Sequence, residues 1–135
     1  MKLIKLNYFT GDDSEWVEEI YINADNIICI RPKDWFSEVE ISGSRHLKVE
    51  ETISEIQSLL DGKDTIQYSH QRRIGKKIQE IRRMMGMNLV EFGKNCGIGI
   101  YAVMKWETGR SLPSAEKLAQ IADLAGITVR DLLNV

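Results

Sequence analysis

Residues 88–107 read NLVEFGKNCGIGIYAVMKWE, and their pattern predicts the fold of the second half of the chain. Asn88 can cap a helix, and Glu91, at the third helical position, completes an arrangement like a capping box. Gly97 supplies the left-handed residue that ends this helix and turns the chain into the next. Two helices of about eight residues joined by so tight a turn form a helix-turn-helix. Gly93 places a small residue where the two helices are expected to cross.

The helical period continues on both sides of this motif. Upstream, apolar residues at helical spacing predict a helix from residue 72 that ends at Gly86. Downstream, Pro113 is expected to open a fourth helix, and Thr128 to cap a short fifth one. Short turns join these elements, so residues 72–135 are expected to form a compact all-α domain of five helices.

The first half of the chain shows a different hydrophobic period. Apolar and polar residues alternate there in short segments, which predicts strands. These segments are residues 3–8, 17–22, 27–30, 39–41 and 47–49. The turn at 42–44 predicts a hairpin, and Thr52 with Glu55 forms a capping box at the start of an amphipathic helix that Gly62 ends. Residues 1–62 are therefore predicted to form four or five antiparallel strands and one helix.

The chain as a whole is thus predicted to be α+β, with a small antiparallel sheet and one helix followed by an all-α domain. Residues 63–71 follow neither period and are expected to be a linker. The sign of the net charge changes near the same linker. Residues 1–69 hold 7 basic and 14 acidic side chains, whereas residues 70–135 hold 11 basic and 6 acidic ones. A basic second half is typical of a domain that faces a polyanion, although charge alone also fits a solvated surface.

Composition excludes several classes of protein. The longest apolar stretches have about four residues, far short of the roughly 20 that a membrane-spanning helix needs. The amino terminus lacks the apolar core of a signal peptide, so we expect a cytoplasmic protein. Cys29 and Cys96 have no partner at ligand spacing, which argues against a disulfide framework or a zinc site. Because no catalytic constellation is evident, we expect no enzyme, cofactor or metal.

The second half resembles the Cro/C1-type (XRE) helix-turn-helix family over residues 72–134. The most specific signal is the segment Lys-Trp-Glu-x-Gly-Arg-x-Leu-Pro-Ser at 105–114, supported by Glu-Phe-Gly at 91–93 and Gly-Ile-Gly at 97–99. The resemblance implies a lambda-repressor-like fold and a bacterial or phage transcriptional regulator that binds operator DNA as a homodimer. It also implies that Arg82 pairs with Glu107 as a structural buttress.

The resemblance further implies how DNA would be held. The third helix of the domain would lie in the major groove, with base-facing positions at Ile100, Tyr101 and Lys105 and with Met104 near the rim. Further positions would contact the phosphate backbone. These are Asn88, Lys94, Gly99, Arg110 and Ser111. Three basic pairs along the first helix, at 72–73, 76–77 and 82–83, can steer DNA toward the domain or lie on a solvated face.

Two positions depart from the family pattern. Leu89 stands where the family commonly has a glutamine that braces DNA, and the start of the third helix, at 99–102, lacks polar side chains that read bases. Two interpretations follow. Either the protein reads thymine-rich DNA through methyl contacts and DNA shape, or this surface binds a protein partner.

The leading hypothesis is a sequence-specific DNA-binding regulator of transcription, expected to be an autoregulatory repressor, that dimerises or senses a partner through residues 1–62. A sheet with exposed edges suits both tasks. The alternative is an antitoxin-type protein whose first domain binds a partner protein and whose helix-turn-helix autoregulates. A helix-turn-helix retained only for protein contacts is a weaker third hypothesis.

Overall fold

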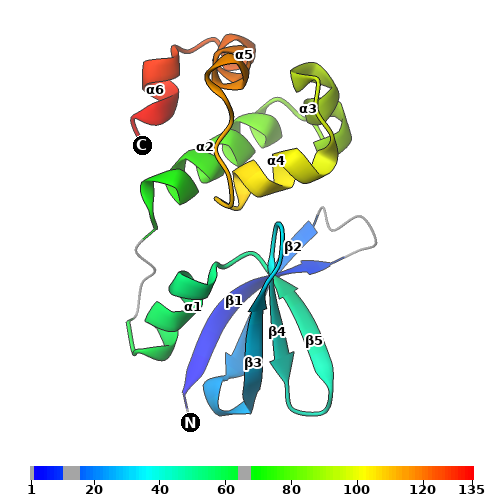
Figure 1. The fold of residues 1–135 in the computed structure, drawn as a ribbon, viewed down its shortest axis with the longest axis vertical. Coiled ribbons are helices and arrows are strands. Elements are labelled where there is room, and N and C mark those ends of the chain that lie inside the picture. Colours follow the sequence, from blue (N-terminus) through cyan, green and yellow to red (C-terminus); the bar gives the residue numbers. More distant parts are fainter. Residues whose placement is uncertain (1, 11–15, 64–67) are drawn as a thin grey trace. The chain divides into compact units, whose positions relative to one another are not determined.

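The computed structural model describes residues 2–10, 16–63 and 68–135. The chain divides into two compact units, Met1–Gln67 and Tyr68–Val135. The first unit contains strands and one helix, and the second contains helices (Figure 1). This confirms the α+β architecture that the two hydrophobic periods predict.

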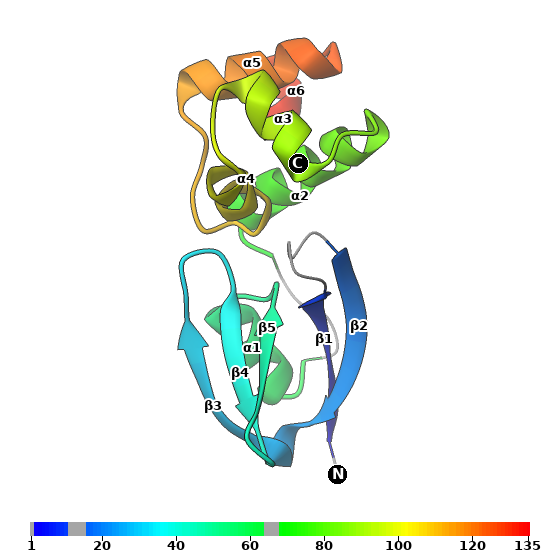
Figure 2. The ribbon, with the colours of Figure 1, turned by 90° about the vertical axis from the view of Figure 1, so that its right-hand side faces the viewer.

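The first unit is an antiparallel sheet with the strand order β2-β1-β5-β4-β3. Its strands are β1 (Leu3–Thr10), β2 (Trp16–Asn23), β3 (Ile27–Pro32), β4 (Ser37–Ile41) and β5 (Arg45–Val49). A 3-10 turn, η1 (Ala24–Asn26), joins β2 to β3, and helix α1 (Ile53–Leu60) follows β5. Five strands in the described part of the unit confirm the upper of the two predicted numbers. Figure 2 shows α1 against one side of the sheet.

Strand β1 is paired differently on its two sides. It pairs with β2 along its full length, whereas it meets β5 only where Tyr8 lies opposite Val49. Past this point, the chain leaves β5 for α1. The N–H of Glu50 still donates to the carbonyl of Asn7 at 2.8 Å, and the N–H of Asn7 donates to the carboxylate Oε1 of Glu51 at 2.6 Å. A side chain thus completes the ladder where β5 stops.

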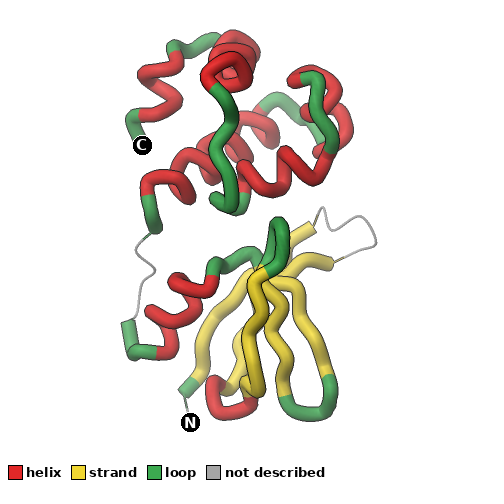
Figure 3. The backbone as a smooth tube through the Cα atoms, in the orientation of Figure 1, coloured by secondary structure: helices red, strands yellow, loops and turns green. Residues whose placement is uncertain are grey.

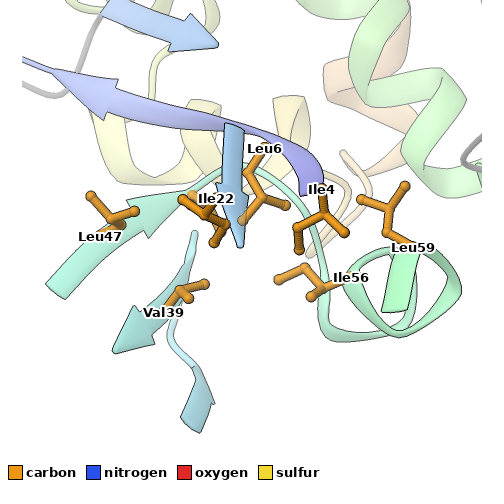
Figure 4. Packing of buried hydrophobic residues seen from close by; sticks show 8 residues of the cluster. Ile4, Leu6, Ile22, Val39, Leu47, Ile56 and Leu59 are labelled. Atoms are coloured by element: carbon orange, nitrogen blue, oxygen red, sulfur yellow. The ribbon is translucent and has the colours of Figure 1, made fainter. Parts of the chain in front are cut away.

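The core of the first unit lies between one face of the sheet and α1. The capping box of Thr52 and Glu55 is present and fixes the start of α1. From there, Ile56 and Leu59 point toward Ile4 of β1 (Figure 4). The other buried apolar residues of this cluster alternate along the strands, as period two requires. They are Leu6, Ile22, Val39, Leu47 and Val49.

The second unit consists of five helices in the described residues (Figure 3). They are α2 (His70–Met84), α3 (Leu89–Cys96), α4 (Ile100–Glu107), α5 (Ala115–Ala125) and α6 (Val129–Leu133). Their apolar faces enclose a core that includes Ile78, Phe92 and Ile121, each fully buried. The five-helix prediction is confirmed.

Two helix starts differ from the prediction, and each time a serine explains the difference. Helix α2 begins at His70, two residues before the predicted start, because the hydroxyl of Ser69 accepts the N–H of Arg72 as an N-cap. Helix α5 begins at Ala115, because Ser114 is its N-cap, so Pro113 precedes the helix instead of opening it. Of the expected linker, residues 64–67 lie outside the described part.

Candidate nucleic-acid interface

Helices α3 and α4 form a helix-turn-helix whose local geometry follows the sequence. The side chain of Asn88 accepts the N–H of Glu91 at 2.8 Å, and the Glu91 carboxylate accepts the N–H of Asn88 at 3.2 Å. This capping box starts α3. Gly97 ends the helix at φ 69° and ψ 35°, a left-handed conformation that favours glycine.

Two glycines allow neighbouring helices to approach the α4 segment. A Cβ added to Gly93 would lie 2.7 Å from the carbonyl oxygen of Ile98, in the turn before α4. A Cβ on Gly75 of α2 would overlap the carbonyl oxygen of Trp106 near the end of α4. The spacing of the motif predicts the role of Gly93. The role of Gly75 was missed, although its place beside Ile74 on the apolar face of α2 is the signal that points to it.

A buried ion pair joins α2 to the end of α4. Arg82 donates from Nε to Oε2 of Glu107 at 2.7 Å and from Nη2 to Oε1 at 3.0 Å. Its remaining nitrogen, Nη1, donates to the carbonyl of Met87 at 3.1 Å. Burial raises the pKa of Glu107, and the hydrogen bonds from Arg82 act against that rise. The fork geometry fixes the position of α4 relative to α2.

A second arginine supports the same helix end. The guanidinium of Arg72 is fully buried, donates to the backbone carbonyl of Glu107 at 3.0 Å, and lies 5.4 Å from the ring centre of Tyr68. Arg72 and Arg82 therefore cannot steer DNA from a solvated face, and that interpretation of the basic pairs is wrong for both residues. The charge pattern of the sequence does not indicate that Arg72 is buried. Its position one helical turn before Gly75, on the packed side of α2, is the signal that could have indicated it.

The exposed side of α4 carries three of the four side chains expected to face DNA. Tyr101 is 60% exposed, and Ile100 and Lys105 are half-buried. Met104 is only 4% exposed, so its expected place at the rim of the DNA contact is wrong. The packed face of this short helix is wide enough to include Met104. It comprises Val103, Met104, Trp106 and Glu107.

The positions expected to contact phosphates lie around this helix pair. Asn88 and Lys94 are exposed, while Arg110 and Ser111 are half-buried in the segment that follows α4. Arg110 donates from Nη1 to the carbonyl of Thr108 at 3.1 Å. Gly99 is the N-cap of α4 and makes no side-chain capping bond. The start of α4 consequently has no capping acceptor of the kind that Asn88 supplies to α3.

The basic character of the second unit is concentrated on side chains that reach solvent. The unit holds 11 basic and 6 acidic residues. Apart from Arg72 and Arg82, each basic residue of the unit is exposed or half-buried. In the described ranges, no helix is long and apolar enough to cross a membrane, and no three His, Cys, Asp or Glu side chains gather where they could hold a metal ion.

Comparison with known families agrees with this geometry. Residues 78–132 match the family model described as Helix-turn-helix, which is of the XRE type. The second unit matches a helix-turn-helix domain. The matched range runs from the middle of α2 into α6 and includes the whole of α3 and α4. Domains of this family bind DNA and act in regulation. No curated protein matches the chain.

Proposed function

We propose that the protein is a sequence-specific regulator of transcription that places α4 in the major groove of double-stranded DNA. One observation carries the proposal: Tyr101 and Lys105 lie one turn apart on the solvent side of α4, a helix that the Arg82–Glu107 pair fixes in place. The net positive charge of the unit supports the same conclusion, because it favours approach to a polyanion.

The side chains on α4 have distinct chemical capacities toward DNA. Lys105 can donate to O6 and N7 of guanine or to a phosphate. Tyr101 can donate its hydroxyl to a phosphate or pack against a base edge. Ile100 offers only apolar contact, for which the C5-methyl group of thymine is the matching surface. Because polar side chains are sparse on this face, recognition relies on thymine methyl groups and on DNA shape.

Contacts to the phosphate backbone would set the position of α4 in the groove. The N–H groups that follow Gly99 suit a phosphate oxygen, because a helix N-terminus carries partial positive charge. Asn88 lies at the corresponding end of α3. Lys94, Arg110 and Ser111 would add contacts that position the domain without reading sequence.

The protein would act as a cytoplasmic homodimer, joined through residues 1–62, on an operator with two half-sites. Two recognition helices related by a two-fold axis read two successive stretches of major groove. A repressor of this kind that binds its own upstream region lowers its own synthesis. The acidic charge of the first unit, with 14 acidic and 7 basic side chains, supports placing DNA on the second unit alone.

The test measures binding of the full chain to duplex DNA from its gene's own upstream region. We expect Lys105→Ala to weaken binding about tenfold or more, and Arg110→Ala to weaken it on all sequences alike. The matched control is Arg130→Ala, which removes one exposed cation from α6. Figure 1 shows α6 and α4 on opposite sides of the second unit. Unchanged binding in both of the first two variants would refute the proposed placement of α4.

Salt dependence adds an independent measurement. If each copy neutralises about four to six phosphates, the logarithm of the affinity falls with the logarithm of salt concentration with a slope near −0.9 per phosphate. Arg110→Ala should reduce this slope by about one. A slope that stays the same in Arg110→Ala would remove this residue from the phosphate contacts and leave the role of Lys105 intact.

An antitoxin-type protein is the second candidate, and the acidic sheet of the first unit favours it. Among the described residues, this sheet ends in the edge strands β2 and β3, and the regular edge β2 suits capture of a basic partner protein by strand addition. The helix-turn-helix would then bind DNA upstream of both genes. Co-expression with the product of an adjacent gene distinguishes the two candidates: a stable complex that lowers the toxicity of this product supports the antitoxin.

A further inference from the structure

The sheet of the first unit has two edge strands, and they differ in how they resist pairing with another strand. The edge strand β3 has a register shift between Ile27 and Cys29, and it ends at Pro32, which has no N–H to donate. Its Arg31 is held by Glu38 at 3.2 Å and by Glu40 at 3.0 Å. Bulges, prolines and charges are the features by which proteins block an edge.

The other edge strand, β2, has neither a bulge nor a proline, and its two charged side chains, Glu18 and Glu19, each have a partner within the unit. Its eight residues pair with β1 in one unbroken register. Among the described residues, β2 forms no other strand pairing. Tyr21, near the end of this strand, is 62% exposed. A long, regular edge without a bulge or a proline is a template for another strand.

The hydrogen bonds of β1 show which backbone groups of β2 face outward. The N–H and the carbonyl of Asn7 point toward the β5 side. Because these groups alternate along a strand, those of Leu6 and Tyr8 point toward β2, where they meet Ile20 and Glu18. In β2, the intervening residues therefore turn their backbone groups to the open edge. They are Val17, Glu19, Tyr21 and Asn23.

We propose that this edge pairs antiparallel with β2 of a second copy of the chain, so that the two sheets become one sheet of ten strands. The proposal rests on the dimerisation through residues 1–62 proposed above and assigns its surface. The two-fold axis passes through Ile20. Glu19 of each copy then exchanges backbone hydrogen bonds with Tyr21 of the other, and Ile20 faces its own counterpart as a non-hydrogen-bonded pair.

Charge selects this register among those that the outward-facing groups allow. A shift that centres the pair on Glu19 or on Glu18 would bring two like charges directly opposite one another, which is destabilising. A shift that centres it on Tyr21 pairs fewer residues of β2. With Ile20 at the centre, residues 17–23 all pair, Glu19 meets Tyr21 and Glu18 meets Ile22.

The acidic side chains of β2 are compatible with a second acidic copy, because each has a partner within its own unit. Glu19 lies 3.5 Å from Nζ of Lys5, and Glu18 accepts the hydroxyl of Tyr8 at 3.2 Å. Ile20 is half-buried and packs against the core cluster of its own unit. Pairing Ile20 with its counterpart would continue this apolar face across the two-fold axis.

Sedimentation of the full chain over a range of concentrations tests the proposal first, and a dimer is expected. Tyr21→Pro removes an outward N–H and leaves the ladder to β1 intact, so the dimer dissociation constant should rise about tenfold or more. The matched control, Tyr21→Thr, removes the same aromatic ring but keeps the N–H and should remain dimeric. Equal losses in the two variants would overturn the backbone pairing.

Cysteine cross-linking tests the register and does not depend on how well the proline variant folds. In a Cys29→Ser background, Ile20→Cys should form a disulfide between copies, since a non-hydrogen-bonded pair has Cα atoms about 4.5 Å apart. Glu18→Cys is the control on the same strand face. Its Cα atoms would lie about 13 Å apart, four residues out of register, and should not cross-link.

The outcomes separate this inference from the function on which it rests. A full chain that stays monomeric would overturn both the pairing and the proposed dimer. A dimer that Tyr21→Pro leaves intact and Ile20→Cys does not cross-link would overturn the assignment to β2 alone, with dimerisation retained. Binding to upstream DNA is measured separately, so its loss in Lys105→Ala bears only on α4.

Discussion

Both units of the chain bury a glutamate, and they satisfy its carboxylate in different ways. In the second unit, Glu107 receives two hydrogen bonds from the guanidinium of Arg82. In the first unit, Glu51 receives the backbone N–H of Asn7 at 2.6 Å and the side-chain amide of the same residue at 3.0 Å. Asn7 brings no charge, and burial raises the pKa of Glu51 to about 7.

The stability of the first unit should therefore depend on pH, and that of the second unit on an ion pair. A carboxylate matched by an arginine holds two helices in a fixed geometry, but it leaves an uncompensated charge if the arginine is removed. For a carboxylate held by neutral donors, burial opposes ionisation. The units should therefore fail under different perturbations.

Removing the arginine of this ion pair should destabilise the second unit more than any other change considered below destabilises either unit. Arg82→Met leaves the carboxylate of Glu107 buried without its bidentate partner and should lower the free energy of unfolding of this unit by about 3–5 kcal/mol. Urea unfolding, followed by NMR signals assigned to each unit, measures the two units separately. The signals of β1 and β5 should keep their midpoint.

The double variant Arg82→Met with Glu107→Leu is the control for this prediction. Replacing both charges with apolar groups removes the buried, uncompensated carboxylate, so most of the lost stability should return. If the double variant is as unstable as Arg82→Met alone, packing around the arginine stem matters more than charge. In that case the comparison between the two glutamates loses its electrostatic basis.

The next effect concerns the first unit and its dependence on pH. Because the pKa of Glu51 lies near 7 in the folded chain and near 4.5 when unfolded, the unfolded state loses its proton first as pH rises. The free energy of unfolding of the first unit should therefore fall between about pH 4.5 and 7, by about 3 kcal/mol, and level off above this range. Urea unfolding at a series of pH values measures this fall.

Glu51→Gln provides the matched comparison. Glutamine keeps an oxygen for the N–H of Asn7 and does not ionise, so the fall with pH should disappear and the first unit should be more stable at pH 8 than in the parent chain. A fall that persists unchanged in Glu51→Gln would show that another group governs the pH dependence.

The sequence predicts the fold well where local chemistry fixes an element. The capping residues Thr52, Asn88 and Thr128 and the left-handed Gly97 mark helix ends that the structure confirms. The starts of α2 and α5 were predicted less accurately, because Ser69 and Ser114 compete with neighbouring residues as caps and only the packed structure selects between them. Strand order was beyond prediction, since nothing local specifies that β1 lies between β2 and β5.

The candidate site was predicted unevenly for a related reason. The helical period identifies which residues of α4 alternate between core and solvent, but it does not give the width of the packed face. Met104 was therefore expected to be accessible and is buried, while Arg72 was expected on a solvated face and supports the end of α4. The hydrogen bonds of Glu51 arise from strand pairing over a separation of 44 residues, and no sequence pattern marks them.

Glycines extend the comparison between the units to a smaller effect. Gly43 of the first unit has φ 88° and open space where a Cβ would lie, whereas Gly93 of the second lies against the backbone of Ile98. Gly93→Ala should lower the stability of the second unit by about 1–3 kcal/mol, because the contact is with backbone that must shift. Gly43→Asn should change the stability of the first unit by only a few tenths of a kcal/mol, since asparagine tolerates positive φ. Urea unfolding of each unit measures both changes. Comparable losses of stability at the two positions would contradict the argument that the backbone contact at Gly93 costs more than the positive φ at Gly43.

Substitutions of Gly99 should have the smallest effect on stability, so they test the proposed DNA binding of the second unit without disturbing its fold. Gly99 has φ −82° and ψ 169°, an extended conformation open to any residue, and a Cβ there would meet no atom within 4 Å. Gly99→Asp and Gly99→Asn should each stabilise α4 by a few tenths of a kcal/mol as better N-caps. Only the aspartate adds a negative charge where a phosphate is proposed to bind, so its affinity for upstream DNA should fall well below that of the asparagine variant, with the difference shrinking at high salt. Equal affinities at low salt would mean that the start of α4 does not approach the phosphate backbone, and the acidic first unit and basic second unit would then need another explanation.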